Sequence, residues 1–242
     1  MLVVSDLLPR IYKVKIEKIF SKDNIFYFNA DRDVLSGKNV YDSILHHPDI
    51  YFFMADKNTM IHSPNMSSKI LKYFKNLGIT LLVGDRAPSG SYPETVLYNS
   101  VRVGNTVICN SEYTDKDILE YVKQHNLRCV TVKQGYVRCS VIQVDDNAII
   151  TSDMGIKNIV EQSGMEVLYV NPDEIILKGE KHGFIGGAAG KIGDKEILFL
   201  GDPCLYQEYE RVMSFIRGKG IKPTILPDLP LIDTGGVFSL KI

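Results

Sequence analysis

Short apolar stretches and amphipathic segments alternate along most of the chain. Within residues 46–230, four segments follow one plan: a strand, a polar turn, a second strand, a helix, a Gly or Asn, and a third strand. The predicted strands are apolar runs of a few residues bounded by turn residues. The predicted helices have apolar side chains at a spacing near 3.6, as at Ile70, Phe74 and Leu77. Each segment is therefore predicted to form a ββαβ unit.

The turn and cap residues recur in the same order in all four segments, at intervals of about 45 residues. Asn and Gly tolerate the positive φ of tight hairpin turns, and they also suit a left-handed helix C-cap. Each signal is weak alone, but the fourfold recurrence indicates an internal repeat. The turns fall at Asn58, Asn105, Asn147 and Lys195, and the helices end at Gly78, Asn126, Gly164 and Gly220.

The residues outside these segments supply a fifth unit that is split between the two ends of the chain. Residues 234–242 form a predicted first strand, and residues 12–20 and 24–30 also have strand-like patterns. Pairing of the terminal strands would close a ring and remove the sheet edge that a linear array exposes. We predict a single α/β domain, a five-unit ββαβ propeller; an open α/β sandwich is the alternative. The predicted units are 46–88, 89–134, 135–180, 181–230, and 231–242 together with 1–45.

Composition narrows the class of protein. The chain has 242 residues, 45% of them hydrophobic, and a net charge of −1, so no basic excess indicates nucleic-acid binding. Its four cysteines form no C-x-x-C pair and no zinc-ligand spacing with histidine, which is typical of free thiols in a reducing compartment. No apolar run approaches the roughly 20 residues that span a membrane. We predict a cytoplasmic protein without nucleic-acid or membrane partners.

The repeat plan resembles the pentein fold, the α/β propeller of guanidine-modifying enzymes such as deiminases, dimethylargininase and amidinotransferases, and the chain looks like a divergent member. Translation initiation factor six has the same architecture. The stretch "TGGVFSL" is similar to the one that carries the catalytic Cys of these enzymes, with Ser239 in the place of that Cys. "QGYVRCS" is similar to their catalytic His stretch, with Tyr136 and Arg138 in the places of His and Asp.

These departures bear on the chemistry that the resemblance implies. Deimination requires a thiolate, an imidazole and carboxylates that hold the guanidinium. Ser239 is a poor nucleophile without an adjacent base, and the phenol of Tyr136 is a weak base at pH 7. Arg138 would repel a guanidinium substrate by about 4 kcal/mol at 4 Å and an effective dielectric of ~20. The usual Cys-His chemistry of the family is therefore expected to be lost.

We predict that the protein binds a small polar or anionic ligand in the central pocket, without a cofactor or metal. Two alternatives stay open. One is an enzyme with a rearranged site that uses Cys139 or Ser239 with His182 or Tyr136. The other is a non-enzymatic binding factor in the manner of translation initiation factor six, with the ribosome as partner. The candidate catalytic residues are Ser239, Tyr136 and Cys139, and the candidate ligand-binding residues are Asn99, Arg138, Asp49, Glu94, Asp233 and His182.

Three of these candidates have a structural interpretation as well. Arg138 is either an anion clamp, whose replacement by Ala abolishes binding and leaves the fold intact, or the partner of Asp233 or Glu94 in an internal ion pair. Cys139 is either a thiolate activated by the neighbouring cation or a core residue. The stretch "HHPDI" at 46–50 has metal-ligating residue types, but no second cluster in the sequence completes a set, so we interpret it as a loop end.

Overall fold

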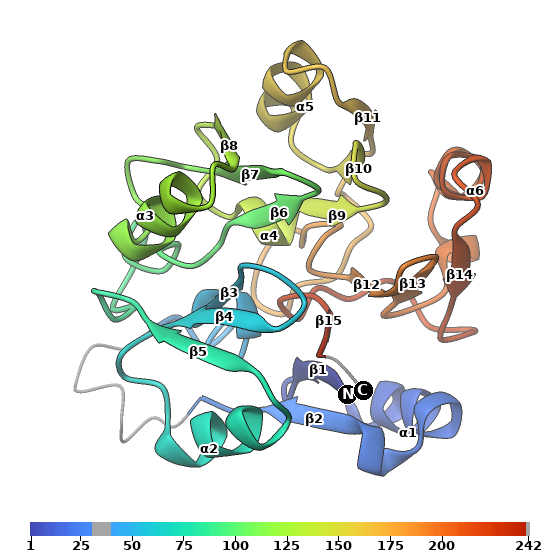
Figure 1. Ribbon diagram of the computed structural model, residues 1–242. Helices are drawn as coiled ribbons and strands as arrows, with labels where there is room; N and C mark the ends of the chain where they lie inside the picture. The colour runs from blue at the N-terminus through green and yellow to red at the C-terminus, as the bar shows by residue number, and fades with distance from the viewer. Residues whose placement is uncertain (31–39, 241–242) are drawn as a thin grey trace.

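The computed structural model describes residues 1–30 and 40–240. In this part of the chain, five three-stranded sheets surround a common centre and the longer helices lie on the outside (Figure 1). This arrangement confirms the five-unit α/β propeller predicted from the repeat. In each sheet the first two strands are antiparallel, and a helix then crosses to a third strand that is parallel to the second.

The first strand of each unit is the innermost strand of its sheet. The first unit consists of β3 (Phe52–Met54), β4 (Thr59–His62), α2 (Ser68–Asn76) and β5 (Thr80–Val83), and a 3-10 turn (Pro48–Ile50) precedes it. The second consists of β6 (Val101–Val103), β7 (Thr106–Cys109), α3 (Lys116–Gln124) and β8 (Arg128–Thr131).

The next two units repeat this order. The third begins with a single helical turn, α4 (Val137–Ser140), and continues with β9 (Val141–Gln143), β10 (Ala148–Thr151), α5 (Met154–Gln162) and β11 (Glu166–Tyr169). The fourth consists of β12 (Ala189–Gly193), β13 (Glu196–Phe199), a 3-10 turn (Pro203–Leu205), α6 (Tyr209–Gly218) and β14 (Lys222–Thr224).

The two ends of the chain build the fifth unit, as predicted. It consists of β15 (Phe238–Ser239), β1 (Leu2–Ser5), α1 (Arg10–Phe20), a 3-10 turn (Lys22–Asn24) and β2 (Ile25–Phe28). Strand β15 is antiparallel to β1, with Leu2 opposite Ser239. The Met1 ammonium donates to the Leu240 carbonyl at 3.1 Å, so the first and last described residues of the chain lie side by side (Figure 1).

One predicted element of this unit is wrong. Residues 12–20 form most of helix α1 and not a strand. The alternation of Lys with apolar residues there suggested a strand, but Tyr12 and Ile16, one helical turn apart, are the buried positions. The second strand of this unit is instead Leu2–Ser5, a fully buried run. The helix restores the ββαβ order to the fifth unit.

The core lies between neighbouring sheets and under the helices. Where the first and fifth units meet, Phe52 of β3 packs on Phe238 of β15 with ring centroids 4.8 Å apart. The same hydrophobic cluster includes Phe28 of β2 and Phe74 of α2. This packing joins the first unit to the fifth and so closes the ring.

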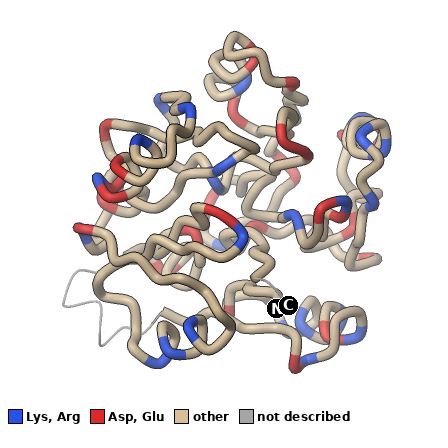
Figure 2. Tube along the Cα trace, in the orientation of Figure 1, with Lys and Arg blue, Asp and Glu red and all other residues tan. Residues whose placement is uncertain are grey.

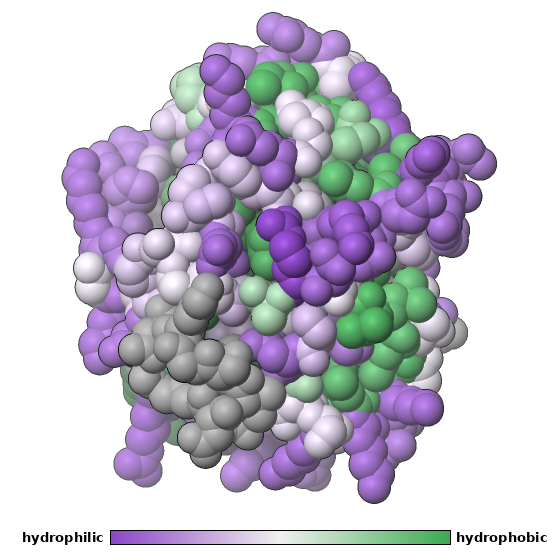
Figure 3. All heavy atoms as spheres, turned by 90° about the vertical axis from the view of Figure 1, so that its left-hand side faces the viewer, coloured by the Kyte–Doolittle hydropathy of each residue, from purple (hydrophilic) through white to green (hydrophobic). Residues whose placement is uncertain are grey.

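On the side that Figure 3 presents, hydrophilic residues predominate on the surface and hydrophobic residues lie in separate groups. Among the residues described, no helix combines the length and the apolar character needed to cross a membrane.

Candidate functional site

The residues that precede the inner strands meet at one end of the ring axis. Each unit brings its chain to the centre immediately before its first strand, so short segments from all five units lie together there. Buried polar side chains come from four of these segments, and glycines come from the fourth unit. The set comprises His47 and Asp49, Asn99, Arg138 and Cys139, Gly186 and Gly187, and Asp233.

Asn99 shapes the segment that carries Arg138 and Cys139. Its side-chain carbonyl oxygen accepts hydrogen bonds from the backbone N–H groups of Arg138, at 2.7 Å, and Cys139, at 3.2 Å. The repeat predicted a strand from Tyr136 onward, but residues 137–140 form the helical turn α4 and the strand starts only at Val141. The amide of Asn99 satisfies N–H groups that a helical turn leaves without intrahelical partners. Both side chains are therefore held at the axis by a residue of the second unit.

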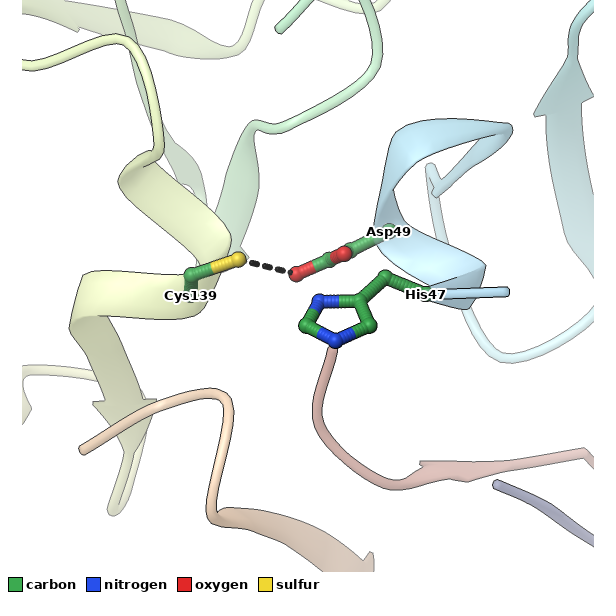
Figure 4. Close-up of side chains that lie close together, drawn as sticks. All are labelled: His47, Asp49 and Cys139. Atoms are coloured by element: carbon green, nitrogen blue, oxygen red, sulfur yellow. Dashed lines mark hydrogen bonds between the residues drawn. The ribbon is translucent and has the colours of Figure 1, made fainter. Parts of the chain in front are cut away.

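Cys139 is the centre of a small buried cluster. Its thiol donates to Asp49 Oδ2 at 2.7 Å, and the Asn99 amide lies 3.4 Å from the sulfur. The imidazole of His47 lies beside the side chains of Asp49 and Cys139 (Figure 4). One potential ligand atom from each of His47, Asp49 and Cys139 lies within 4.8 Å of the others, and all three residues are buried.

His47 is unusual because its polar atoms have no hydrogen-bond partner. Neither ring nitrogen is hydrogen-bonded to any described residue, although the side chain is only 1% exposed. Its Nδ1 lies 3.9 Å from Asp233 Oδ1, which is longer than a hydrogen bond. Burial lowers the pKa of His47 to about 3, so the imidazole is neutral at physiological pH. The second carboxylate oxygen of Asp49 also lacks a partner.

The carboxylates and the thiol affect one another's protonation. Burial raises the pKa of Asp49 to about 6 and that of Asp233 to about 7, while the charge of Arg138 opposes the rise in both. Burial and the two carboxylates raise the pKa of Cys139 well above its ordinary value. The thiol therefore keeps its proton at neutral pH. This environment is the opposite of the electropositive one that activates a nucleophilic cysteine.

Arg138 fills the ring axis beside this cluster. Its guanidinium donates to the backbone carbonyls of Gly186 at 2.9 Å, Val237 at 3.0 Å and Val141 at 3.4 Å. Its Cζ atom lies 4.8 Å from the centroid of the Phe238 ring. The side chain thus links the third, fourth and fifth units. No described carboxylate forms a salt bridge with it, so the buried Asp49 and Asp233 compensate its charge without direct contact.

Three glycines allow this close packing. A Cβ atom on Gly187 would lie 1.8 Å from Asp233 Oδ1. Gly235 has a φ of +80°, and a Cβ atom there would lie 2.5 Å from the Cβ of His47. The glycine pair before the last strand thus brings the chain against His47 and, at Gly236, against Arg138.

A pocket of about 790 Å³ opens at the other end of the axis, where the hairpin turns lie. The inner strands of all five sheets contribute to its wall, and Arg138 is one of its lining residues. The guanidinium therefore lies between the pocket and the thiol cluster. Ser239 also lines the pocket; it is exposed, and its hydroxyl donates to the Ile192 carbonyl at 3.2 Å.

The predicted site residues are thus divided among three places. Asp49, Asn99, Arg138, Cys139 and Asp233 meet at the axis, whereas Ser239 lies at the opposite end from the thiol. The remaining candidates lie outside the cluster. The hydroxyl of Tyr136 shares a hydrogen bond of 2.7 Å with that of Thr95, and burial is the main cause that raises the pKa of Tyr136 to about 12. Glu94 is exposed and accepts a hydrogen bond from Ser89. His182 is half-buried, with its Nδ1 3.0 Å from the Gly183 carbonyl oxygen.

The sequence did not place His47 in this cluster. The interpretation of "HHPDI" as a loop end rests on the lack of a second cluster in the sequence that completes a set of metal ligands. The structure supplies the missing group from another unit, since Cys139 lies beside Asp49. An alignment of the residues that precede the inner strand of each unit would have indicated this cluster, because His47 is among those residues in the first unit. The neighbouring His46 has a different contact, accepting from the backbone N–H of Ala30 at 2.9 Å.

Residues 13–238 match a family model described as a family of unknown function, DUF6873. The chain belongs to this family. No curated protein matches its sequence.

Solved structures with the same fold include two amidinotransferases and DDAH. The inosamine-phosphate amidinotransferase of Streptomyces griseus has a TM-score of 0.59 at 10% identity, with 98% of this chain and 82% of that chain covered. The saxitoxin-pathway amidinotransferase SxtG of Microseira wollei has a TM-score of 0.57 at 10% identity, with 93% and 87% covered. DDAH of Pseudomonas aeruginosa, in complex with citrulline, has a TM-score of 0.55 at 8% identity, with 97% and 91% covered. This DUF6873 protein therefore has the pentein fold.

Proposed function

We propose that this protein binds a small anionic or zwitterionic molecule in the 790 Å³ pocket at the hairpin end of its ring. The supporting observation is the pocket itself, because the inner strands of all five units line one cavity on the axis. A cavity of this volume is in the range of small-molecule sites. The propeller thus supplies a preformed concave site that none of its units could form alone.

The charges that line the pocket favour this class of ligand. Arg102 and Lys191 project from the inner strands β6 and β12, and Arg138 lies at the axis. The acidic lining residues Asp56, Asp146 and Asp194 come from hairpin turns instead, and so does Lys57. A carboxylate or phosphate would therefore meet the guanidinium and ammonium groups, and an amino group would meet the acids near the turns. Neutral hydrogen-bonding groups from Ser100, Gln143 and Ser239 also line the pocket.

A bound molecule can be sought directly. Native mass spectrometry of freshly purified protein is expected to show a small-molecule adduct, and Ser239→Trp, which fills the pocket, is expected to remove it. Ser214→Trp is the matched control, because Ser214 is an exposed residue of α6 on the outside of the ring. Lys191→Met should weaken binding at least tenfold, whereas Lys195→Met, in the turn after the same strand, should leave it unchanged.

If no adduct is found, thermal-shift titration with small carboxylates, phosphates and amino acids tests the same proposal. A ligand at 100 times its Kd stabilises the folded protein by about 2.7 kcal/mol, which is readily measured as a rise in melting temperature. Absence of both an adduct and any stabilisation that Ser239→Trp abolishes would contradict a binding function for this pocket.

Guanidine chemistry is expected to be absent. The named neighbours are amidinotransferases and DDAH, but at 8–10% identity they share only the fold. Here Cys139 is 3% exposed and its thiol stays protonated, while Ser239 has no described histidine or carboxylate as hydrogen-bond partner. We expect no release of citrulline or urea from arginine, agmatine or methylarginines above the blank. Turnover that Ser239→Ala or Cys139→Ala abolishes would instead favour the enzyme with a rearranged site.

The mixed surface charge supports a small-molecule ligand over a nucleic acid. Along the described part of the trace in Figure 2, acidic and basic positions are interspersed, without a long basic stretch. Nucleic-acid binding depends on clustered Lys and Arg that replace counterions along the backbone. A cytoplasmic location and the absence of a ribosomal partner remain predictions, which fractionation and ribosome co-sedimentation would test.

A further inference from the structure

We propose that His47, Asp49 and Cys139, completed by Asp233, form a buried site for one divalent transition-metal ion of the zinc type. This site lies at the opposite end of the axis from the proposed ligand pocket, and it does not depend on that proposal. Its role is structural: the ion links the first, third and fifth units at the centre of the ring.

The geometry of the cluster suits such an ion. Zinc binds cysteine sulfur at about 2.3 Å and histidine nitrogen or carboxylate oxygen at about 2.0–2.2 Å, with four ligands in a tetrahedron. The ligand atoms of one ion are therefore roughly 3–4 Å apart. In this cluster the candidate atoms of His47, Asp49 and Cys139 lie within 4.8 Å of one another, so side-chain shifts of about 1 Å would bring them to that spacing. We assign Asp233 as the fourth ligand because its Oδ1 lies 3.9 Å from His47 Nδ1; this oxygen also accepts from the Gly235 N–H at 3.0 Å.

An independent observation points to a ligand here: several buried polar atoms of the cluster lack hydrogen-bond partners. Among the described residues, both ring nitrogens of His47 and Oδ1 of Asp49 have none, although these side chains are 0–1% exposed. Buried polar groups in proteins are nearly always satisfied, because leaving one unpaired costs about 1–3 kcal/mol. Figure 4 shows the imidazole and the Asp49 carboxylate both directed toward Cys139. A metal ion among them would satisfy the carboxylate and one ring nitrogen.

The charge of the surroundings matches a divalent ion. As ligands, Cys139, Asp49 and Asp233 are anions, and His47 is neutral. The nearby guanidinium of Arg138 offsets one of the three negative charges, and a divalent ion offsets the other two. The buried site is then neutral, which is the state that a low-dielectric interior favours.

The donor types select the kind of metal. A thiolate and an imidazole are soft or borderline ligands that suit zinc, cobalt or copper, whereas magnesium and calcium prefer sites made entirely of oxygen. In the structure the Cys139 thiol proton forms the hydrogen bond to Asp49. On binding, the sulfur–metal bond replaces that bond to hydrogen, and the proton leaves to solvent without any redox change. Four protein ligands in a fully buried place leave no open position for substrate, which is characteristic of a structural metal site.

The decisive experiment uses cobalt as the probe, because a thiolate bound to Co²⁺ gives a charge-transfer band in the near ultraviolet that oxygen and nitrogen ligands do not give. A variant with Cys109→Ala, Cys129→Ser and Cys204→Ser keeps Cys139 as its only thiol. It removes the alternative thiol pair, Cys109 and Cys129, whose sulfurs lie 3.5 Å apart. We expect this variant and the wild type to bind one equivalent of Co²⁺ with the same band, and zinc to displace it.

Substitutions within the cluster provide the matched comparison. His47→Gln is expected to lower the affinity for Co²⁺ at least tenfold, whereas His125→Gln, at an exposed histidine of the second unit, should leave it unchanged. Cys139→Ser should abolish the charge-transfer band. If the sole-thiol variant does not fold, elemental analysis of the wild-type protein and its melting temperature with zinc and with a chelator serve as the second measurement.

Two results would overturn the proposal. The first is a folded wild-type protein that, after incubation with zinc and removal of free metal, retains less than a tenth of an equivalent and melts at the same temperature with and without zinc. The second is a cobalt band that persists in Cys139→Ser or disappears in the sole-thiol variant, because either would assign the metal to other cysteines.

Discussion

Deletion of residues 237–242 is expected to convert the folded protein into aggregated protein. It removes β15, which pairs with β1, together with Val237, Phe238 and Leu240, all at most 7% exposed. Loss of two large buried side chains costs about 5–10 kcal/mol, comparable with the roughly 5–15 kcal/mol by which a domain is stable. The deletion also leaves the edges of β1 and β12 available for pairing with other chains. Size-exclusion chromatography and thermal melting measure both effects.

A circular permutant provides the control for ring closure. The ammonium of Met1 lies 3.1 Å from the carbonyl oxygen of Leu240, so a short linker can join the two ends without strain. New termini can be opened at Gly179–Glu180, in an exposed connection of the third unit. We expect this permutant to keep the oligomeric state of the wild type and to melt close to the wild-type temperature. A deletion protein that also keeps this oligomeric state, with unchanged melting, would show that pairing of the terminal strands is not needed for the ring.

The repeat made most of the fold predictable, because the same local signals occur four times in one order. The fifth unit was harder, since its first strand and its helix lie at opposite ends of the sequence. Residues 12–20 were predicted as a strand from the alternation of Lys with apolar side chains, but they form helix α1. Burial of Tyr12 and Ile16 against the core decides between the two patterns, and that contact is tertiary. Local periodicity could not reveal it.

From the sequence, a site residue could be placed near the axis only by its position within its repeat unit. Asp49, Asn99, Arg138 and Cys139 precede inner strands, so the repeat placed them near the axis, and they do meet there. The repeat could not say which end of the axis a residue faces, and Ser239 lies at the end with the pocket. It also could not show that Asn99 turns residues 137–140 into a helical turn, which directs Cys139 toward Asp49. Both depend on hydrogen bonds between units.

Arg138→Met is expected to destabilise the protein by about 3–5 kcal/mol, the usual cost of breaking a buried charged network. Methionine has a similar length but no charge and no donors, so the carbonyls of Gly186 and Val237 would lose their partner. Asp49 and Asp233 would also lose the nearby positive charge. For a chain of this length the loss corresponds to a fall in melting temperature of roughly 6–20 °C. This result differs from the intact fold expected from the sequence for Arg138→Ala.

Arg102→Met is the matched control for the loss of stability expected in Arg138→Met. Arg102 also lines the pocket and also donates to backbone carbonyls, those of Ala55 at 2.6 Å and Gly104 at 2.9 Å, but it is half-buried in strand β6. Water can replace its hydrogen bonds, so its loss should cost on the order of 1 kcal/mol. Chemical denaturation of both variants, with ligand titration alongside, separates the two roles. Equal and small losses of stability, with binding abolished only in Arg138→Met, would make Arg138 a ligand clamp. A large loss confined to Arg138→Met would instead mean that the arginine is part of the structure of the ring, and the pocket would then depend on Arg102 and Lys191 to bind its anion.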